Sequence, residues 1–143
     1  MIKEFSHGSP GYLEMVRLRD LHLRQPIGLR LKDEERIDEE GHRHFAWIED
    51  ECIVGGLIAN PVDATTAKLR QMWIHPDRNG RGLGSKLLAA AEDVLAAGGV
   101  RHFNLHARQN AVGFYQMNGY VAVGDEFPEV GRPHLRMEKH LAP

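Results

Sequence analysis

The sequence has little cysteine and no long apolar run. Its single cysteine, Cys52, can form no disulfide within the chain, and no stretch approaches the roughly 20 apolar residues of a membrane span. The first eight residues, MIKEFSHG, also lack the apolar core of a signal peptide. We therefore expect a cytoplasmic protein with no membrane partner. Because Cys52 lies in the apolar run CIVGGLIA, we expect it to be a buried thiol in a strand.

An excess of charge of one sign is also missing. Lysine and arginine number 18 against 20 aspartate and glutamate residues, which gives a formal net charge of −2. Proteins that bind nucleic acid usually carry a clear positive excess or aromatic residues interleaved with basic ones, and neither feature is present. The composition predicts no nucleic-acid partner, so any anion-binding site must be local.

No repeat, low-complexity stretch or linker divides the 143 residues, of which 42% are hydrophobic. This length is enough to bury one sizeable core, and we expect a single domain over residues 1–143. His42 and His44 lie on one face of an expected strand, but no further metal ligands stand at suitable spacing nearby. We therefore expect no metal site.

Hydrophobic periodicity and turn residues predict the order of secondary structure. A helix should begin at Ser9 and Pro10 and end before Pro26, and the charged run LKDEERIDEE (31–40) should be a solvated helix or loop. Strands are expected at residues 1–5, 42–49, 52–61, 67–75, 100–108, 121–127 and 134–141, with further helices at 85–97 and 109–118.

The stretch HPDRNGRGLGSKLLAAAE (75–92) carries the clearest functional signal. Gly80, Gly82 and Gly84 let the backbone turn tightly and approach a ligand, and good helix formers follow from Ser85. Three basic side chains add positive charge at the start of this helix: Arg78, Arg81 and Lys86. A helix N-terminus with exposed N–H groups binds anions, so the stretch predicts a phosphate-binding loop.

The glycine spacing excludes two common phosphate loops. A Walker loop needs lysine directly after its last glycine, whereas Ser85 separates Gly84 from Lys86. A dinucleotide loop needs its third glycine three residues after the second, whereas Gly84 follows Gly82 by two. A turn that only links a strand to a helix remains an alternative.

Two segments together resemble the signature of the GNAT superfamily of acyl-CoA-dependent N-acetyltransferases. These are MWIHPDRNGRGLG (72–84) and AVGFYQMNGY (111–120), in the family's order and separation. The resemblance covers residues 45–125, and PHLRM (133–137) is similar to the closing PHxxM strand of a bacterial subgroup. It implies an α/β fold with a single mixed, strongly bent central sheet of about six to seven strands flanked by helices. Two central strands should splay apart to admit the CoA pantetheine.

The resemblance also implies an activity: transfer of an acetyl group from acetyl-CoA to a primary amine of a small molecule or peptide, by direct attack on the thioester. A homodimer is common in the family. The cofactor-binding residues that it implies are Met72, Trp73, Ile74, Arg78, Asn79, Gly80, Arg81, Gly82, Leu83, Gly84, Ser85, Asn110 and Phe114. Asn79 stands where the family has glutamine or arginine, and Arg108 stands where many members have an asparagine that touches the cofactor.

Tyr115 matches the family tyrosine that protonates the departing sulfur, and the ordinary pKa values of a phenol and a thiol lie within about two units. A packing aromatic is the alternative. His134 and Glu126 are the catalytic candidates for the base that takes the amine proton, although His134 at a strand start can be purely structural. The expected acceptor-binding residues are Arg24, Gln71 and Glu129. The functional alternative is a non-catalytic acyl-CoA-binding sensor or interaction module.

Overall fold

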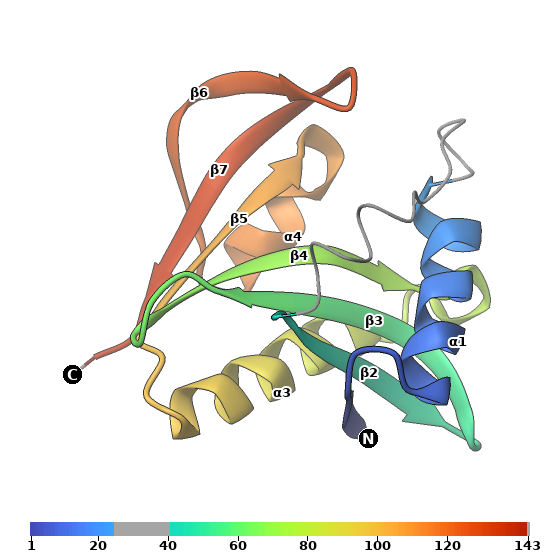
Figure 1. Cartoon of the computed structure of the whole chain (residues 1–143). Coiled ribbons are helices and arrows are strands. Elements are labelled where there is room, and N and C mark those ends of the chain that lie inside the picture. Colours follow the sequence, from blue (N-terminus) through green and yellow to red (C-terminus); the bar gives the residue numbers. More distant parts are fainter. Residues whose placement is uncertain (25–40, 143) are drawn as a thin grey trace.

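The computed structural model describes residues 1–24 and 41–142 (Figure 1). The strands are β1 (Ile2–Phe5), β2 (Arg43–Glu49), β3 (Cys52–Pro61), β4 (Thr66–Ile74), β5 (His102–Arg108), β6 (Val121–Glu129) and β7 (Arg132–His140). The helices are α1 (Pro10–Arg19), α3 (Leu83–Ala97) and α4 (Val112–Met117), with single turns η1 (Asp20–Arg24), η3 (Pro76–Arg78) and η4 (Gln109–Ala111). The charged run 31–40 lies outside the described residues.

The strands form one mixed sheet in the order β1-β2-β3-β4-β5-β7-β6. All neighbouring pairs are antiparallel except β4 and β5, which are parallel and are connected through α3. Helices cover both faces of the sheet. His44 of β2 packs edge-on against Tyr12 of α1, whereas Phe45, the next residue, shares a core cluster with Leu87 of α3. Successive side chains of a strand point to opposite faces, so α1 and α3 lie on opposite sides. This is the mixed, helix-flanked sheet that the sequence predicted.

β4 and β5 separate after a short paired stretch (Figure 1). Their register runs only from Thr66 opposite His102 to Leu69 opposite Leu105, and both strands then continue without pairing to each other. Within β4, Gln71 and Met72 both lie opposite Leu57, because Gly56 pairs with Trp73 and Ile58 with Arg70. Gln71 takes a left-handed φ of 54°, the mark of a bulge that bends this strand at the point of separation.

A buried polar cluster connects α3 to the end of the sheet formed by β6 and β7. Glu92 of α3 is 6% exposed, accepts a hydrogen bond from the Tyr120 hydroxyl at 2.6 Å, and pairs with the Lys139 ammonium at 2.7 Å. Removing the Tyr120 hydroxyl would leave one buried carboxylate oxygen without its donor. We expect Tyr120→Phe to lower the free energy of unfolding by about 1.5–3 kcal/mol in urea titration. The matched variant Tyr115→Phe loses only a 3.7 Å contact with sulfur, so an equal loss in both would contradict this view.

Two local expectations need correction. Cys52 is exposed rather than buried, because it is the first residue of β3 and follows the tight turn at Asp50 and Glu51, both with positive φ. The helix after the glycine loop starts at Leu83 rather than Ser85, with Gly82 as its N-cap. In the described part of the chain, no helix has the length and apolar character needed to cross a membrane.

Candidate functional site

A cleft opens where β4 leaves β5. Its cavity volume is about 530 Å³, and it lies between the end of β4, the glycine loop, the start of α3 and α4. It is lined by Met72, Trp73, Ile74, Arg78, Asn79, Gly80, Gly82, Leu83, Gly84, Ser85, Ala111, Phe114, Tyr115 and Met117. The structure thus brings together all the predicted cofactor-binding residues except Arg81, which is exposed, and Asn110, which lines a different cavity.

The glycine loop presents open backbone to this cleft. Gly80 and Gly82 have φ values of 81° and 72°, and a Cβ at either position would meet nothing within 4 Å. No side chain caps the N-terminus of α3, and its first turn holds no acidic residue. The first N–H groups of this 15-residue helix therefore have no intrahelical partner, and Arg78 lines the cleft beside them. Together they form a positive site for an anion.

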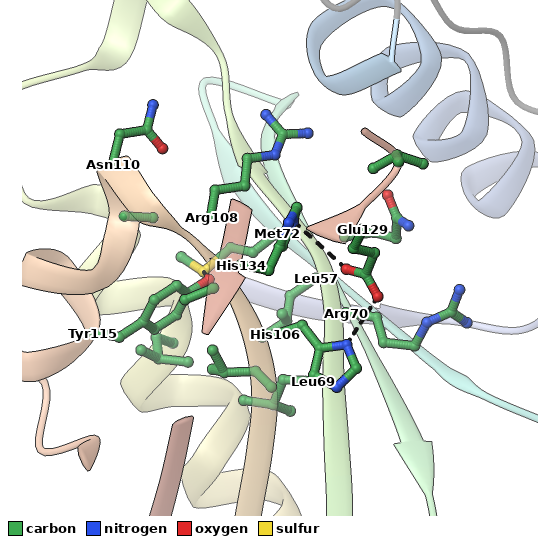
Figure 2. Close-up of a pocket in the computed structure, with 16 residues that line it drawn as sticks. Leu57, Leu69, Arg70, Met72, His106, Arg108, Asn110, Tyr115, Glu129 and His134 are labelled. Atoms are coloured by element: carbon green, nitrogen blue, oxygen red, sulfur yellow. Dashed lines mark hydrogen bonds and ion pairs between the residues drawn. The ribbon is translucent and has the colours of Figure 1, made fainter. Parts of the chain in front are cut away.

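A second cavity, of about 250 Å³, lies on the other side of the separated strands. It shares Met72, Ala111 and Tyr115 with the cleft. The Tyr115 hydroxyl lies 3.7 Å from the Met72 sulfur, and Figure 2 shows both side chains together at one end of this cavity. Tyr115 therefore stands where the cleft and the cavity meet.

Burial raises the pKa of Tyr115 to about 12, against a smaller opposing effect of the Arg108 guanidinium. The hydroxyl consequently keeps its proton near neutral pH and can donate it. The gap to an ordinary thiol pKa of about 8.5 is wider than the two units expected from the sequence, so transfer to a free thiolate is less favourable than that expectation implied. Tyr115 is therefore suited to donate a hydrogen bond, and to transfer its proton to an atom on which negative charge develops.

Glu129 joins two histidines in the second cavity (Figure 2). Its carboxylate lies 2.9 Å from His106 Nδ1 and 3.5 Å from His134 Nε2. His134 is 3% exposed, and its Nδ1 lies 2.8 Å from the carbonyl oxygen of Arg132. Because a carbonyl only accepts, Nδ1 carries the proton, and Nε2 is the nitrogen free to accept one beside the carboxylate.

The remaining predicted site residues are placed less favourably. Gln71 and Asn110 line the second cavity. Glu126 is exposed on β6 and lines neither the cleft nor the second cavity. Arg24 ends η1, and its side chain lies outside what the structure describes.

Sequence reasoning missed Arg70 and His106, which line the second cavity, and Lys68, which lines a cavity beside it. Their only sequence signal is alternation along β4 and β5, which sets them on the face away from the core. Within residues 1–24 and 41–142, no three His, Cys, Asp or Glu side chains are grouped so that they could hold a metal ion.

Residues 31–141 match the family model described as an acetyltransferase (GNAT) domain. The chain belongs to the GNAT acetyltransferase family. YjcF of Bacillus subtilis, named as an uncharacterized N-acetyltransferase, is 33% identical over 109 residues, which cover 74% of this chain and 77% of YjcF. YyaT of the same organism is 35% identical over 77 residues, covering 54% of this chain and 52% of YyaT, so the match spans about half of that relative.

Solved GNAT structures share the whole fold at low sequence identity. An aminoglycoside 6'-acetyltransferase type Ii superposes with a TM-score of 0.79 at 22% identity, covering 100% of this chain and 98% of that chain. A GNAT family acetyltransferase from Elizabethkingia anophelis with acetyl-CoA bound gives a TM-score of 0.73 at 15% identity, over 99% and 97% of the two chains. The GNAT match includes both the glycine loop and Tyr115, the two features on which the site depends.

Proposed function

We propose that this protein is an N-acyltransferase, a single domain over residues 1–143, that moves an acetyl group from acetyl-CoA to a primary amine. The observation that carries the proposal is that an anion-binding cleft and a separate polar cavity meet at Tyr115. One opening can take the donor and the other the acceptor. Membership of the GNAT family and the likeness in fold to a GNAT protein with acetyl-CoA bound support this assignment.

The cleft fits a CoA thioester. Gly80 and Gly82 leave room for a pyrophosphate against the first turn of α3, where Arg78 adds charge. The unpaired edge of β4 from Met72 to Ile74 offers backbone groups to the amide-bearing pantetheine arm. Acetyl-CoA supplies an activated acyl carbon and a thiol as leaving group.

The reaction then requires two proton transfers, which we assign to residues of this chain. The acceptor nitrogen forms the new C–N bond while the C–S bond breaks, so the nitrogen must lose a proton and the sulfur must gain one. We propose that His134 Nε2, with Glu129 beside it, takes the first, because both lie in the acceptor cavity whereas Glu126 is exposed. Tyr115 supplies the proton that the sulfur gains. Backbone N–H groups at the β4 bulge donate hydrogen bonds to the carbonyl oxygen, on which negative charge develops.

Calorimetric titration with acetyl-CoA, CoA and ATP tests the donor half of this proposal. We expect micromolar binding of both CoA compounds and none of ATP. Thiol release in the presence of a panel of primary amines then tests turnover, with propionyl-CoA as a comparison for acyl preference. CoA binding without thiol release from any amine would favour a sensor or interaction module, and absence of CoA binding would overturn the proposal.

A further inference from the structure

Lys68 makes no hydrogen bond or ion pair in the part of the chain that the structure describes, although it faces a cavity. It lies half-buried on β4 and lines a third cavity, of about 260 Å³, with Arg70, Gln71, His106 and Glu129 among its neighbours. No hydrogen bond or ion pair joins its ammonium to another described residue. An ammonium that is partly removed from water without a hydrogen bond or ion pair favours an anion as ligand.

Charges of both signs surround Lys68. Burial is the largest influence and lowers the pKa of Lys68; the Glu129 carboxylate raises this pKa, and the Arg70 and Arg136 guanidinium groups lower it. Lys68 and Arg70 lie two residues apart on one face of β4. The third cavity thus holds two cationic side chains against one carboxylate, and Glu129 is already paired with His106 and His134, so this end favours an anionic group over a second cation.

The second and third cavities lie side by side. Both are lined by Leu69, Arg70, Gln71, His106, Glu129 and Val130. Of these two cavities, Tyr115 and His134 line the second and not the third, whereas Lys68 lines the third and not the second. Met72 lies four residues after Lys68 on the strand, roughly 13 Å of chain at about 3.3 Å per residue. One elongated acceptor could thus reach both ends.

We propose that the acceptor is a primary amine that also carries an anionic group, a carboxylate or a phosphate, and that Lys68 binds this group. The amine lies at the end formed by Tyr115 and His134, and several bonds separate it from the anion. This inference rests on the proposed function for the identity of the reacting amine. It predicts that amines carrying a second positive charge are poor acceptors.

Matched ligands test the inference without requiring turnover. The acetylated products of 5-aminopentanoate, 1-aminopentane and 1,5-diaminopentane differ only in the group at one end: anionic, neutral or cationic. Titrated calorimetrically into the protein saturated with CoA, the anionic product should bind at least tenfold more tightly than the other two. Acetylated 3-aminopropyl phosphate forms the second arm, and the tighter of the two anionic products identifies the anion as carboxylate or phosphate.

Variants of two lysines complete the experiment. Lys68→Met should remove the preference for the anionic product, and Lys68→Arg should restore most of it. Lys3→Met is the matched control, because Lys3 is exposed on β1, far from β4 in the sheet order, and it should keep the full preference. Equal binding of the three pentane-derived products, or an unchanged preference in Lys68→Met, would overturn the inference.

The proposed function is judged separately, from the binding of CoA in the same preparation. If CoA does not bind, the free amines 5-aminopentanoate and 1-aminopentane are titrated instead into the protein alone. Their relative affinity, with and without Lys68, still decides whether Lys68 holds an anion. Failure of the donor site and failure of the Lys68 site are thus distinguishable.

Discussion

Gly82→Glu is expected to abolish CoA binding, with a loss of affinity of at least 100-fold in calorimetric titration. Gly82 is the N-cap of α3 and lines the cleft, and a Cβ there would project into open space. The added carboxylate would lie at the positive end of the helix, where it takes the place of a phosphate and repels the remaining charge of the pyrophosphate. Steric and electrostatic effects therefore act in the same direction.

Backbone strain must be separated from this effect. Gly82 has a φ of 72°, a conformation that costs an L-residue roughly 1–2 kcal/mol, so the substitution should also lower stability. Gly124 on β6 has a φ of 80°, equally open surroundings and no place in the cleft, so Gly124→Glu should carry a similar strain and keep CoA affinity. A folded Gly82→Glu protein that binds CoA like wild type would show that the loop is only a turn.

The sequence predicted the site best where its residues lie close together along the chain. The glycine loop, the start of α3 and the edge of β4 lie within one continuous segment, so the glycine spacing and the GNAT resemblance of that segment already placed their residues together. Within that segment, the directions of single side chains and the first residue of the helix were not predicted. The η3 turn leaves Arg78 on the cleft and Arg81 exposed, and helix formers alone did not show that Gly82 would cap the helix.

The side of the site that we propose for the acceptor was predicted only in part, since Gln71, Glu129 and His134 were expected there but His106 and Lys68 were not, because this side depends on strand register. Glu129 comes from β6, His106 from β5 and Lys68 from β4, and these strands meet only in the folded sheet. The bulge at Gln71 had no signal either, since glutamine seldom adopts a positive φ and no glycine marks the position. Residues that lie far apart in sequence thus form the half of the site that we propose selects the acceptor.

Tyr115→Phe is the second large expected effect: a loss of turnover of about 10²-fold or more, with CoA affinity near that of wild type. The hydroxyl lies at the junction of the two cavities, and its one hydrogen bond in the described part of the chain is the long contact with the Met72 sulfur. Phenylalanine keeps the ring that packs against Phe114 and Tyr120. Only the proton donor is lost, so kcat should fall while donor binding persists.

Tyr120→Phe separates chemistry from packing in this comparison. The Tyr120 hydroxyl donates a hydrogen bond to Glu92, and Tyr120 lines neither the cleft nor the second cavity. Tyr120→Phe should therefore be less stable than wild type and keep the same kcat per folded molecule. Because burial raises the pKa of Tyr115 to about 12, its ionisation should add no alkaline limb to the wild-type rate between neutral pH and a pH of about 10. A Tyr115→Phe enzyme with full kcat would assign this side chain to packing and the sulfur's proton to water, whereas a selective loss of kcat would establish Tyr115 as the residue that completes thiol release.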